Sequence, residues 1–479
     1  MTLFNKSSIL FILNIVINLN ISFSMQISTN PFTTEINGKV PNNSAIEIEQ
    51  ILENAETEKK SWKSLGFEKR SAFLTNLSDL LLENKQSLAK LITMENGCPV
   101  SQTYSEVDKS ISIIKYFVEN GQKMVADEIV AENETVKNYI KYDPIGLILH
   151  ISPYNYPLYL ALRPLIPGLL AGNTVILKTP SNTPLLGMEI KQLIEKAGFP
   201  TGVFSVLFVP GSDLEPVIAD ERVNLITLIG SEKAGSSVAT IAGKHIKKTI
   251  LELGGNDPFI VFEDVIIDAV VENAIVSRLR NAGQSCNAAK RFLVHEKIAP
   301  LFIEKLKEKL LEKTIADPMD EKTDLGPLAT EKSLETAIRQ IQKSIEMGAL
   351  NVLGCHVAAD KGFTLMPSIL TSVTIDMPVF KDEVFAPIFP ISTFKTVQEA
   401  INLANTSIYG LGASVWSANP SIVSQCINSL ETGNVAINSI VRGDPKMPYG
   451  GVKKSGYGRE FSTIGMRELV NIKSIMIKK

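Results

Sequence analysis

An alternation of short apolar strands with amphipathic helices restricts the fold of this chain more than any other feature. A β-branched segment at 174–177 is followed by a turn and by apolar residues at helical spacing over 185–197. Strand-like segments return at 203–209 and 225–229. Strands that alternate with helices at this spacing predict a parallel, doubly wound sheet, and so an α/β protein.

The alternation starts again after the glycines at 254–255, which predicts a second α/β unit that runs to about residue 438. The chain shows no internal repeat and no low-complexity linker, so we expect its domains to pack closely. A length of 479 residues suits two or three domains. The expected elements of this unit are a strand at 259–262, a helix at 268–279, a strand at 291–294 and a helix at 300–314.

The segment before the first sheet is expected to be helical and then extended. Apolar residues recur at helical spacing over 45–64, 68–94 and 105–125. Gly97 follows the second of these stretches and is expected to end that helix, as glycine commonly does. From 129 to 151 the pattern becomes strand-like, with a break at Asp143-Pro144.

Charge and cysteine usage exclude several classes of protein. The formal net charge is -3, whereas a nucleic-acid-binding protein usually carries a basic surplus. The four histidines are scattered, and no C-x-x-C pair occurs, so we expect no metal site and no disulfide scaffold. Few, widely spaced thiols suit a reducing compartment. The cysteines are Cys98, Cys286, Cys355 and Cys426.

Three short segments carry residues that are suited to catalysis or to cofactor binding. The glycine-rich turn at 229–235 follows a strand and opens a helix, so its backbone N–H groups suit a phosphate, although such turns also need glycine for backbone reasons alone. Glu252 lies beside two glycines and has the chemistry of a general base, or of an ordinary loop carboxylate. Cys286 lies where a helix breaks, and it suits either a nucleophile or simple packing. No segment alone decides between these alternatives.

Together these segments resemble the aldehyde dehydrogenase superfamily, over essentially the whole chain from about Met25. The family's L-E-L-G-G segment stands at 251–255 and its G-Q-x-C segment at 283–286. Thirty-four positions separate Glu252 from Cys286, which is the family's usual spacing. Further matches follow in the family's order at 153–157, Lys178, 230–231, 383–387 and 448–456.

The resemblance implies a role for each matched residue. Cys286 is expected to attack an aldehyde and form a thiohemiacetal, which becomes a thioester after hydride transfer to a nicotinamide. Asn155 and the Cys286 backbone N–H are expected to hold the oxyanion, each such donor contributing about 2.7–4 kcal/mol. Glu252 is expected to activate the hydrolytic water. The expected cofactor-binding residues are Tyr154, Lys178, Ser181, Gly230, Ser231, Leu253, Glu383 and Phe385.

The cofactor is expected to be NADP or NAD. Relatives often carry a glutamate three residues after the lysine, where it binds both ribose hydroxyls, but here that position is Ser181. Without the carboxylate, a 2′-phosphate meets no repulsion and Lys178 attracts it, so we expect NADP to be accepted or preferred. The alternative is that Ser181 is only a turn residue after Pro180.

Two arginines favour a substrate with a distal carboxylate. Arg163 and Arg280 lie where the succinate-semialdehyde branch of the family has arginines that bind that group, for which the planar guanidinium is suited. The alternative is that each arginine pairs with a structural carboxylate. Some relatives carry a second cysteine where this chain has Ala288, and a carboxylate-binding serine where it has Gly443. The neighbouring Arg442 is a candidate substitute for that serine.

Three other functions compete with succinate-semialdehyde oxidation. The first is a dehydrogenase of broad specificity for aliphatic or aromatic aldehydes. The second is transfer of the acyl group to coenzyme A, which an intact Glu252 disfavours. The third is a catalytically silent cofactor-binding or structural protein, which the joint presence of Cys286, Glu252 and Asn155 disfavours.

The resemblance also implies domains and assembly. We expect two doubly wound parallel-sheet domains and a small β oligomerisation element that makes a homodimer or homotetramer. Alternation at 470–475 is consistent with an added strand. The expected division is a Rossmann-like cofactor-binding domain at 25–124 and 147–253, a catalytic domain at 254–438 and the oligomerisation element at 125–146 and 456–479.

The first 24 residues admit two interpretations. Lys6, an apolar run and a small-residue end give the outline of a signal peptide, but asparagines interrupt the run, which is too short and polar to span a membrane. The alternative, which we favour, is that Met25 is the true start. A nicotinamide enzyme needs an intracellular cofactor pool, so we expect a cytoplasmic protein with a small aldehyde as its only partner besides its own copies.

Overall fold

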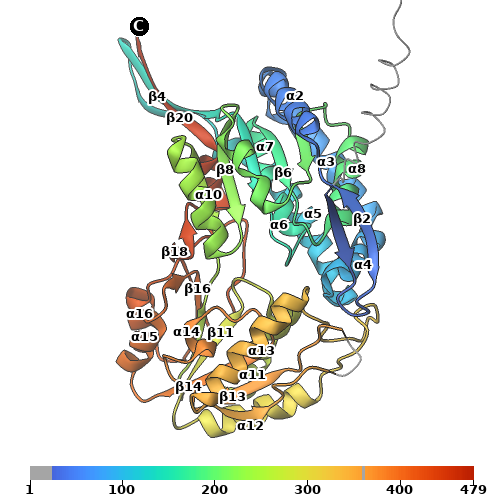
Figure 1. Cartoon of the computed structure of the whole chain (residues 1–479). Coiled ribbons are helices and arrows are strands. Elements are labelled where there is room, and N and C mark those ends of the chain that lie inside the picture. Colours follow the sequence, from blue (N-terminus) through green and yellow to red (C-terminus); the bar gives the residue numbers. More distant parts are fainter. Residues whose placement is uncertain (1–23, 359–361) are drawn as a thin grey trace, which may run out of the picture.

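A computed structural model describes residues 24–358 and 362–479. The signal-like segment expected at the N-terminus lies almost wholly outside these residues. Two α/β lobes, one above the other in Figure 1, carry a long β-hairpin that projects from the upper lobe. Within the described ranges, no helix is both long and apolar enough to cross a membrane.

The first lobe is built on a six-stranded sheet of order β19-β9-β8-β5-β6-β7. All neighbours run parallel except β19, which is antiparallel to β9. From β5 the chain winds outward through β6 and β7, then returns to the other side of β5 and winds through β8 and β9. The strands are β5 (Leu147–Ile151), β6 (Thr174–Lys178), β7 (Phe204–Leu207), β8 (Val223–Ile229), β9 (Lys248–Glu252) and β19 (Gly456–Tyr457).

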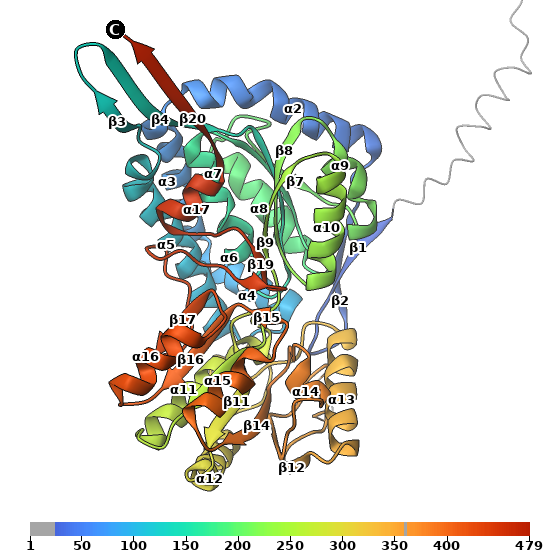
Figure 2. The same ribbon diagram turned by 90° about the vertical axis from the view of Figure 1, so that its left-hand side faces the viewer.

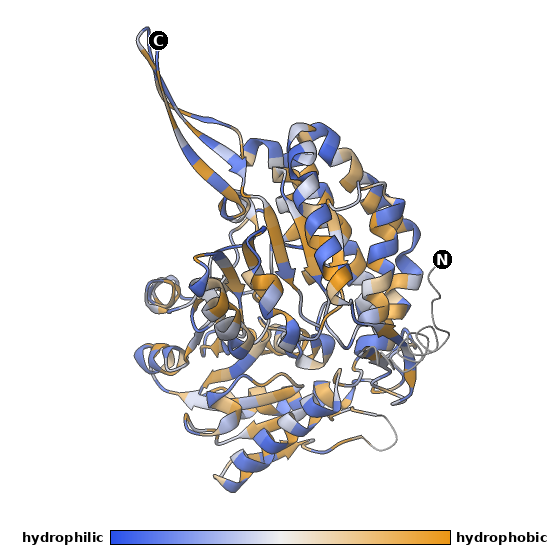
Figure 3. Cartoon of the chain, turned by 45° about the horizontal axis from the view of Figure 1, so that its top comes forward, coloured by the Kyte–Doolittle hydropathy of each residue, from blue (hydrophilic) through white to orange (hydrophobic). Residues whose placement is uncertain are grey.

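Helices bury both faces of this sheet. Successive residues of β5 enter different cores, with Ile148 in one and Leu147 and Leu149 in the other, as the two-residue period of a strand requires. Figure 3 shows these apolar strands enclosed by helices of mixed polarity. The first core is closed by α3 (Phe67–Glu83), α5 (Val100–Met124), α7 (Leu165–Ala171) and α8 (Pro184–Lys196), the second by α2 (Ala45–Ser64), α9 (Glu215–Ala219) and α10 (Glu232–Lys244).

Helix boundaries follow from capping residues. Ser44 and Glu47 form a capping box at the start of α2. The single helix expected over 68–94 is wrong, because α3 ends at Asn84 and α4 (Lys85–Asn96) starts anew. The Asn84 side-chain amide donates to the Leu80 carbonyl at 2.8 Å and so closes the first helix. Gly97 ends α4 in a left-handed conformation, as expected.

The second lobe contains a seven-stranded sheet of order β12-β13-β14-β11-β10-β16-β17. Its strands are parallel apart from β12, and a separate core fills the lobe. The expected α/β fold with two parallel sheets is therefore confirmed. The strands are β10 (Asp257–Val261), β11 (Ala289–His295), β12 (Leu350–Leu353), β13 (Ser368–Thr371), β14 (Ile388–Phe394), β16 (Gly412–Trp416) and β17 (Asn434–Ile437).

Helices also cover the second sheet, and they lie around the lower lobe in Figure 2. The helix α11 (Ile267–Leu279) leads into the segment that carries Cys286. The other helices are α12 (Ala299–Leu311), α13 (Glu331–Glu346), α14 (Pro378–Lys381), α15 (Val397–Asn405) and α16 (Pro420–Ser429).

The projecting hairpin is formed by β3 (Glu128–Glu132) and β4 (Val136–Pro144), and β20 (Val470–Lys478) pairs with β4 along its whole length. The hairpin stands clear of both lobes in Figures 1 and 2. The structure differs from the expected division after residue 456. The strand β19 completes the first sheet and α17 (Ser462–Glu468) packs on α5, so only β20 joins the hairpin.

Two smaller sheets had no counterpart among the expected elements. The strands β1 (Met25–Thr29) and β2 (Ile36–Pro41) pair antiparallel and pack on α8, which places the start of the described chain on the first lobe. The strands β15 (Tyr409–Gly410) and β18 (Val452–Lys453) tie the end of the second lobe to the returning C-terminal segment.

Candidate active site

The carboxyl ends of the first sheet bring several expected site residues to one edge. Lys178 ends β6 and Glu252 ends β9, while Gly230 directly follows β8 and Tyr154-Asn155 follow β5. The winding direction reverses at β5, and ligands of doubly wound sheets bind in the crevice outside such a reversal. The edge faces the second lobe, which supplies Cys286.

The segment that presents Cys286 is held in an unusual backbone conformation. After α11, Asn281 and Ala282 adopt positive φ angles of 48° and 53°. A side chain at Gly283 would put its Cβ 2.4 Å from the Ala386 carbonyl oxygen, so glycine is required there. Strained residues persist where surrounding contacts hold them, and the Asn281 backbone N–H donates to the Gln102 side chain at 2.9 Å.

Asn155 links the two lobes at the nucleophile. Its side-chain amide donates to the Gln284 carbonyl at 3.0 Å, two residues before Cys286. The Asn155 carbonyl in turn accepts hydrogen bonds from the side chains of Asn281 at 2.6 Å and Asn96 at 3.2 Å. These bonds fix the buried Asn155 amide against the backbone of the segment that carries Cys286, and the amide has a second N–H group besides the one bonded to Gln284.

The Cys286 thiol is partly buried between charges of both signs. Its sulfur lies 4.0 Å from the Tyr449 hydroxyl. Burial raises the pKa of the thiol, and the neighbouring Lys290 and Arg163 oppose that rise. Cations near a cysteine favour the thiolate, which is the nucleophilic form.

Glu252 is a buried carboxyl with an orphaned oxygen. The side chain is 3% exposed, and its Oε1 has no hydrogen-bond partner among the described residues. Burial raises the pKa of Glu252 well above its usual range, Glu460 adds to the rise, and Arg163 opposes it. A Cβ at Gly450 would lie 2.6 Å from that oxygen, so glycine there leaves room beside it. A carboxyl with a raised pKa is suited to proton transfer near neutral pH.

Arg163 has a structural partner. Its guanidinium forms an ion pair with Glu460, and both side chains are 5% exposed. It also lies over the rings of Tyr449, Phe461 and Tyr159, with 5.1 Å to the first. Burial would lower the pKa of Arg163, but Glu460 more than offsets this and raises it. The structure thus supports, for Arg163, the pairing with a structural carboxylate, and places its charge beside Glu252 and Cys286.

Arg280 differs from Arg163 because its guanidinium is unpaired. The Nε and Nη2 atoms are buried and have no hydrogen-bond partner in the described chain. Arg280 lines a pocket of about 290 Å³ that also contains Cys286, Lys109 and Arg442. Desolvation, and then the charges of Arg280 and Arg442, lower the pKa of Lys109. No carboxylate among the described residues forms an ion pair with these three cations, although the buried Glu106 lines the same pocket and raises the pKa of Lys109. The pocket wall thus carries three cations beside one buried carboxyl.

Lys109 was missed by the sequence analysis, whereas Arg442 was only a candidate. Lys109 lies on α5, about 180 positions before Cys286, and its polar character fits the exposed face of an amphipathic helix equally well. Tyr449 and Glu460 were also missed as neighbours of the reactive groups. Only the docking of the C-terminal segment onto the first lobe brings them there.

Several residues that are expected to bind the cofactor lie at or just after the carboxyl ends of the first sheet. Lys178 is 6% exposed, burial lowers its pKa to about 8, and no described residue pairs with its ammonium. Ser231 caps α10, where it accepts a bond from the Ala234 N–H at 3.2 Å, and Ser181 is exposed after β6. Leu253 packs against Gly235 at the start of α10, where a Cβ would lie 2.6 Å from its side chain. A buried, unpaired ammonium and a serine-capped helix N-terminus at the same edge of the sheet are each suited to a phosphate-bearing cofactor.

The opposite wall of the crevice comes from the second lobe. Glu383 and Phe385 line a cavity of about 310 Å³ together with Tyr154, and the two rings meet edge-on at 6.4 Å. Glu383 accepts a hydrogen bond from the Gly255 backbone N–H at 3.0 Å. A carboxylate and two aromatic rings suit a ribose and a flat ring system.

A doubly wound sheet whose carboxyl edge faces a second lobe with a partly buried cysteine is typical of a cofactor-dependent enzyme of the α/β class. The aldehyde dehydrogenase family model matches residues 22–475, and the chain belongs to this family. The resemblance found in the sequence is thereby confirmed.

Relatives and solved structures agree with this family. A probable succinate-semialdehyde dehydrogenase [NADP(+)] from Synechocystis sp. is 37% identical over 454 residues, covering 95% of this chain and 100% of the relative. Succinate-semialdehyde dehydrogenase [NADP(+)] 1 from Mycobacterium ulcerans is 36% identical, covering 94% of this chain and 99% of its own. The succinic semialdehyde dehydrogenase of Streptococcus pyogenes, solved with NADP+, is 33% identical with a TM-score of 0.92, covering 95% and 100%.

Proposed function

We propose that this enzyme oxidises succinate semialdehyde to succinate with NADP as the hydride acceptor. The observation that carries the proposal is the unpaired Arg280 guanidinium, flanked by Lys109 and Arg442 in the pocket that contains Cys286. A carboxylate at the far end of the aldehyde would satisfy these buried donors. The names of the relatives point to the same substrate.

The residues of this chain divide the reaction between them. The Cys286 thiolate attacks the aldehyde carbon, while the Asn155 amide and the Cys286 backbone N–H hold the oxyanion. A nicotinamide held by Glu383 and Phe385 would supply the hydride acceptor, and loss of the hydride from that carbon leaves a thioester on Cys286. Glu252 removes a proton from a water that attacks the thioester carbon; the carbon–sulfur bond breaks, and the acid leaves.

The test of this proposal is a steady-state comparison of succinate semialdehyde with hexanal and benzaldehyde, each with NADP and with NAD. We expect the highest kcat/KM for succinate semialdehyde with NADP. Comparable or higher values for the neutral aldehydes would establish the broad-specificity alternative instead. Formation of succinyl-coenzyme A in place of succinate would establish acyl transfer, and no NADPH with any aldehyde would establish a silent protein.

Cofactor choice is expected to depend on Ser181. In Ser181→Glu, a carboxylate would stand near the 2′-phosphate, and two negative charges about 4 Å apart repel by about 1–4 kcal/mol. We therefore expect kcat/KM for NADP to fall about tenfold or more, with the value for NAD unchanged or higher. Because Ser181 is exposed, the variant should fold normally. An unchanged NADP to NAD ratio would make Ser181 a simple turn residue.

Glu460 is expected to set the pH at which hydrolysis begins. Its negative charge raises the pKa of Glu252, so Glu460→Gln should lower that pKa and also free Arg163 to stabilise the Glu252 carboxylate. Because Glu252 works as a base, the acidic limb of kcat should move to lower pH. The measurement is the pH profile of kcat in both proteins. A limb that stays in place, or moves to higher pH, would contradict the assignment of Glu252.

We also propose that the hairpin mediates assembly into a homodimer or homotetramer. The hairpin and β20 form a three-stranded sheet whose outer strands are β3 and β20. Both outer strands expose large apolar side chains, which isolated protomers rarely present as a group. Among them Ile472 is 59% exposed and Met476 80% exposed. Because the reaction uses an intracellular cofactor, we propose the cytoplasm as its compartment. Light scattering of the purified chain tests the assembly, and a monomer at micromolar concentration would contradict it.

A further inference from the structure

A fully buried lysine lies behind the nucleophile and takes no part in the proposed reaction. Lys290 belongs to β11 and is 0% exposed. Its ammonium donates to the carbonyl oxygens of Ser285 at 2.8 Å and of Cys286 at 2.5 Å. The same ammonium lies 3.4 Å from the Glu383 carboxylate and 5.7 Å from the centre of the Phe385 ring. Lys290 therefore contacts both the segment that carries Cys286 and the cavity lined by Glu383 and Phe385, here called the cofactor cleft.

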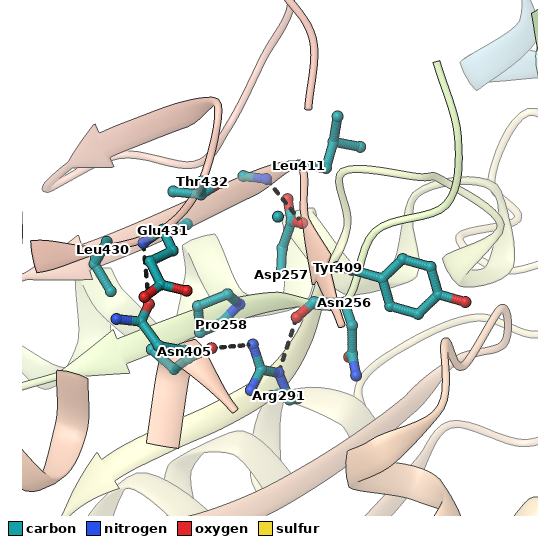
Figure 4. Close-up of a pocket in the computed structure, with 14 residues that line it drawn as sticks. Asn256, Asp257, Pro258, Arg291, Asn405, Tyr409, Leu411, Leu430, Glu431 and Thr432 are labelled. Carbon is teal, nitrogen blue, oxygen red and sulfur yellow. Dashed lines mark hydrogen bonds between the residues drawn. The ribbon is translucent and has the colours of Figure 1, made fainter. Parts of the chain in front are cut away.

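A buried ammonium is costly unless it is compensated by opposite charge and by acceptors. Two carboxylates provide this compensation for Lys290. Glu383 forms the ion pair above, and Lys290 in turn lowers the pKa of the buried Asp257, which burial raises to about 6. Asp257 accepts a hydrogen bond from the Gly412 N–H at 3.0 Å, and Figure 4 shows it in a small pocket that Asn256 and Arg291 also line.

We propose that Lys290 is a positioning residue that couples occupancy of the cofactor cleft to the reactivity of Cys286. The inference rests on the proposed function in one respect, which is that Glu383 binds the nicotinamide ribose. The ammonium fixes the carbonyls of the two peptide bonds on either side of the Cys286 Cα, and so holds the backbone N–H of Cys286 and its thiol in place. Its charge also favours the thiolate.

The pKa of the Cys286 thiol depends on neighbouring charges of both signs, and Lys290 is one of them. Lys290 and Arg163 lower its pKa, whereas Glu383 and Asp257 raise it. The charged and titratable groups that face it are Lys290, Arg163, Glu383, Asp257, Tyr449 and Tyr159. Lys290 is the largest of the charged contributions that lower the pKa, and Glu383 is the largest that raise it.

Cofactor binding changes this balance through Glu383. When ribose hydroxyls donate to the Glu383 carboxylate, its negative charge is partly neutralised by those bonds. The carboxylate then screens the Lys290 ammonium less, and it repels the thiolate less. Both changes lower the pKa of Cys286, so the nucleophile becomes reactive when the hydride acceptor is present.

The experiment is the rate of Cys286 alkylation by iodoacetamide as a function of pH, with and without NADP. Lys290→Met keeps the length of the side chain and removes its charge. One pKa unit changes the thiolate fraction about tenfold below the pKa, so we expect alkylation at pH 7 to be about tenfold slower than in the wild type. We also expect NADP to accelerate alkylation in the wild type but much less in the variant. Lys290→Arg should restore part of the rate.

Two further variants make the result specific. Glu383→Gln should alkylate faster than wild type without NADP and lose most of the NADP effect. Arg291→Met is the matched structural control, because Arg291 is a similarly buried cation on the same strand. It donates to the carbonyls of Asn256, Leu403 and Ala404 and not to those of Ser285 and Cys286, and Figure 4 shows it beside Asn256. We expect Arg291→Met to lower the melting temperature without shifting the alkylation profile.

An alkylation profile of Lys290→Met that matches wild type would overturn the proposal. If that variant does not fold, an unchanged or slower rate in Glu383→Gln would overturn it equally. A shift in Arg291→Met as large as that in Lys290→Met would also overturn it, because general loosening would then explain both. Alkylation needs no aldehyde, so these results stand apart from the substrate assignment, which the kinetic comparison tests separately.

Discussion

A Glu252→Gln variant is expected to produce about one equivalent of NADPH per active site and then nearly stop. Attack by Cys286 and hydride transfer do not require this carboxylate, so the first half of the reaction should proceed. Hydrolysis of the thioester does require a base, and a positioned general base accelerates such a step about 10²–10⁴-fold. The steady-state rate should fall by that factor while the burst remains. Rapid-mixing absorbance at the NADPH band measures both phases.

The burst distinguishes Glu252 from every other group near the thiol. Mass spectrometry of the quenched variant should find the acyl group attached to Cys286. Cys286→Ala is the matched control, and it should show neither a burst nor turnover, because it cannot form the thiohemiacetal. Steady-state turnover of Glu252→Gln within a few-fold of wild type would refute the assignment and make Glu460, a buried carboxyl that acts on Glu252, the next candidate base.

The two lobes and their sheets could be predicted because each strand and helix is encoded by a short, continuous pattern of apolar residues. Apolar segments such as 174–177 are buried on both faces of a parallel sheet, and the spacing of strands and helices then restricts the topology. The break at Asn84 could not be anticipated in the same way. The apolar period continues across it, and a single side-chain amide bonded to the Leu80 carbonyl decides where α3 ends.

The candidate site was predictable where its residues belong to contiguous motifs. Cys286, Glu252 and Asn155 were predicted from short segments in a fixed order; Glu252 and Asn155 lie at the carboxyl ends of the first sheet, and Asn155 is bonded to the segment of Cys286, while their roles stay predictions. The environment of Arg163 was not predictable, since its partner Glu460 lies almost 300 positions away and reaches it only through the return of the C-terminal segment. From their sequence positions, both arginines were equally good candidates to bind a substrate carboxylate. Only the structure shows that Arg163 has a carboxylate partner, Glu460, and that Arg280 has none among the described residues.

The difference in ion pairing between Arg163 and Arg280 leads to a prediction about Arg280. Replacing its unpaired guanidinium in Arg280→Gln should lower kcat/KM for succinate semialdehyde by about 10- to 150-fold, because hydrogen bonds to a charged group contribute about 1.5–3 kcal/mol. For hexanal, which offers no carboxylate, kcat/KM should change less than threefold. The quantity that matters is therefore the ratio of kcat/KM for the two aldehydes, measured in the variant and in the wild type.

Lys313→Gln is the matched control for this ratio. Lys313 lines a neighbouring pocket that also contains Arg280, but its ammonium is paired with Asp324 at 3.3 Å, and it should leave the ratio unchanged. An equal loss of kcat/KM for both aldehydes in Arg280→Gln would mean that Arg280 supports the nucleophile segment, which begins directly after it. Arg280 would then not bind the substrate carboxylate. An unchanged ratio with full activity would shift the carboxylate-binding role to Lys109 and Arg442. A selective loss for the semialdehyde alone is the result that the unpaired guanidinium requires.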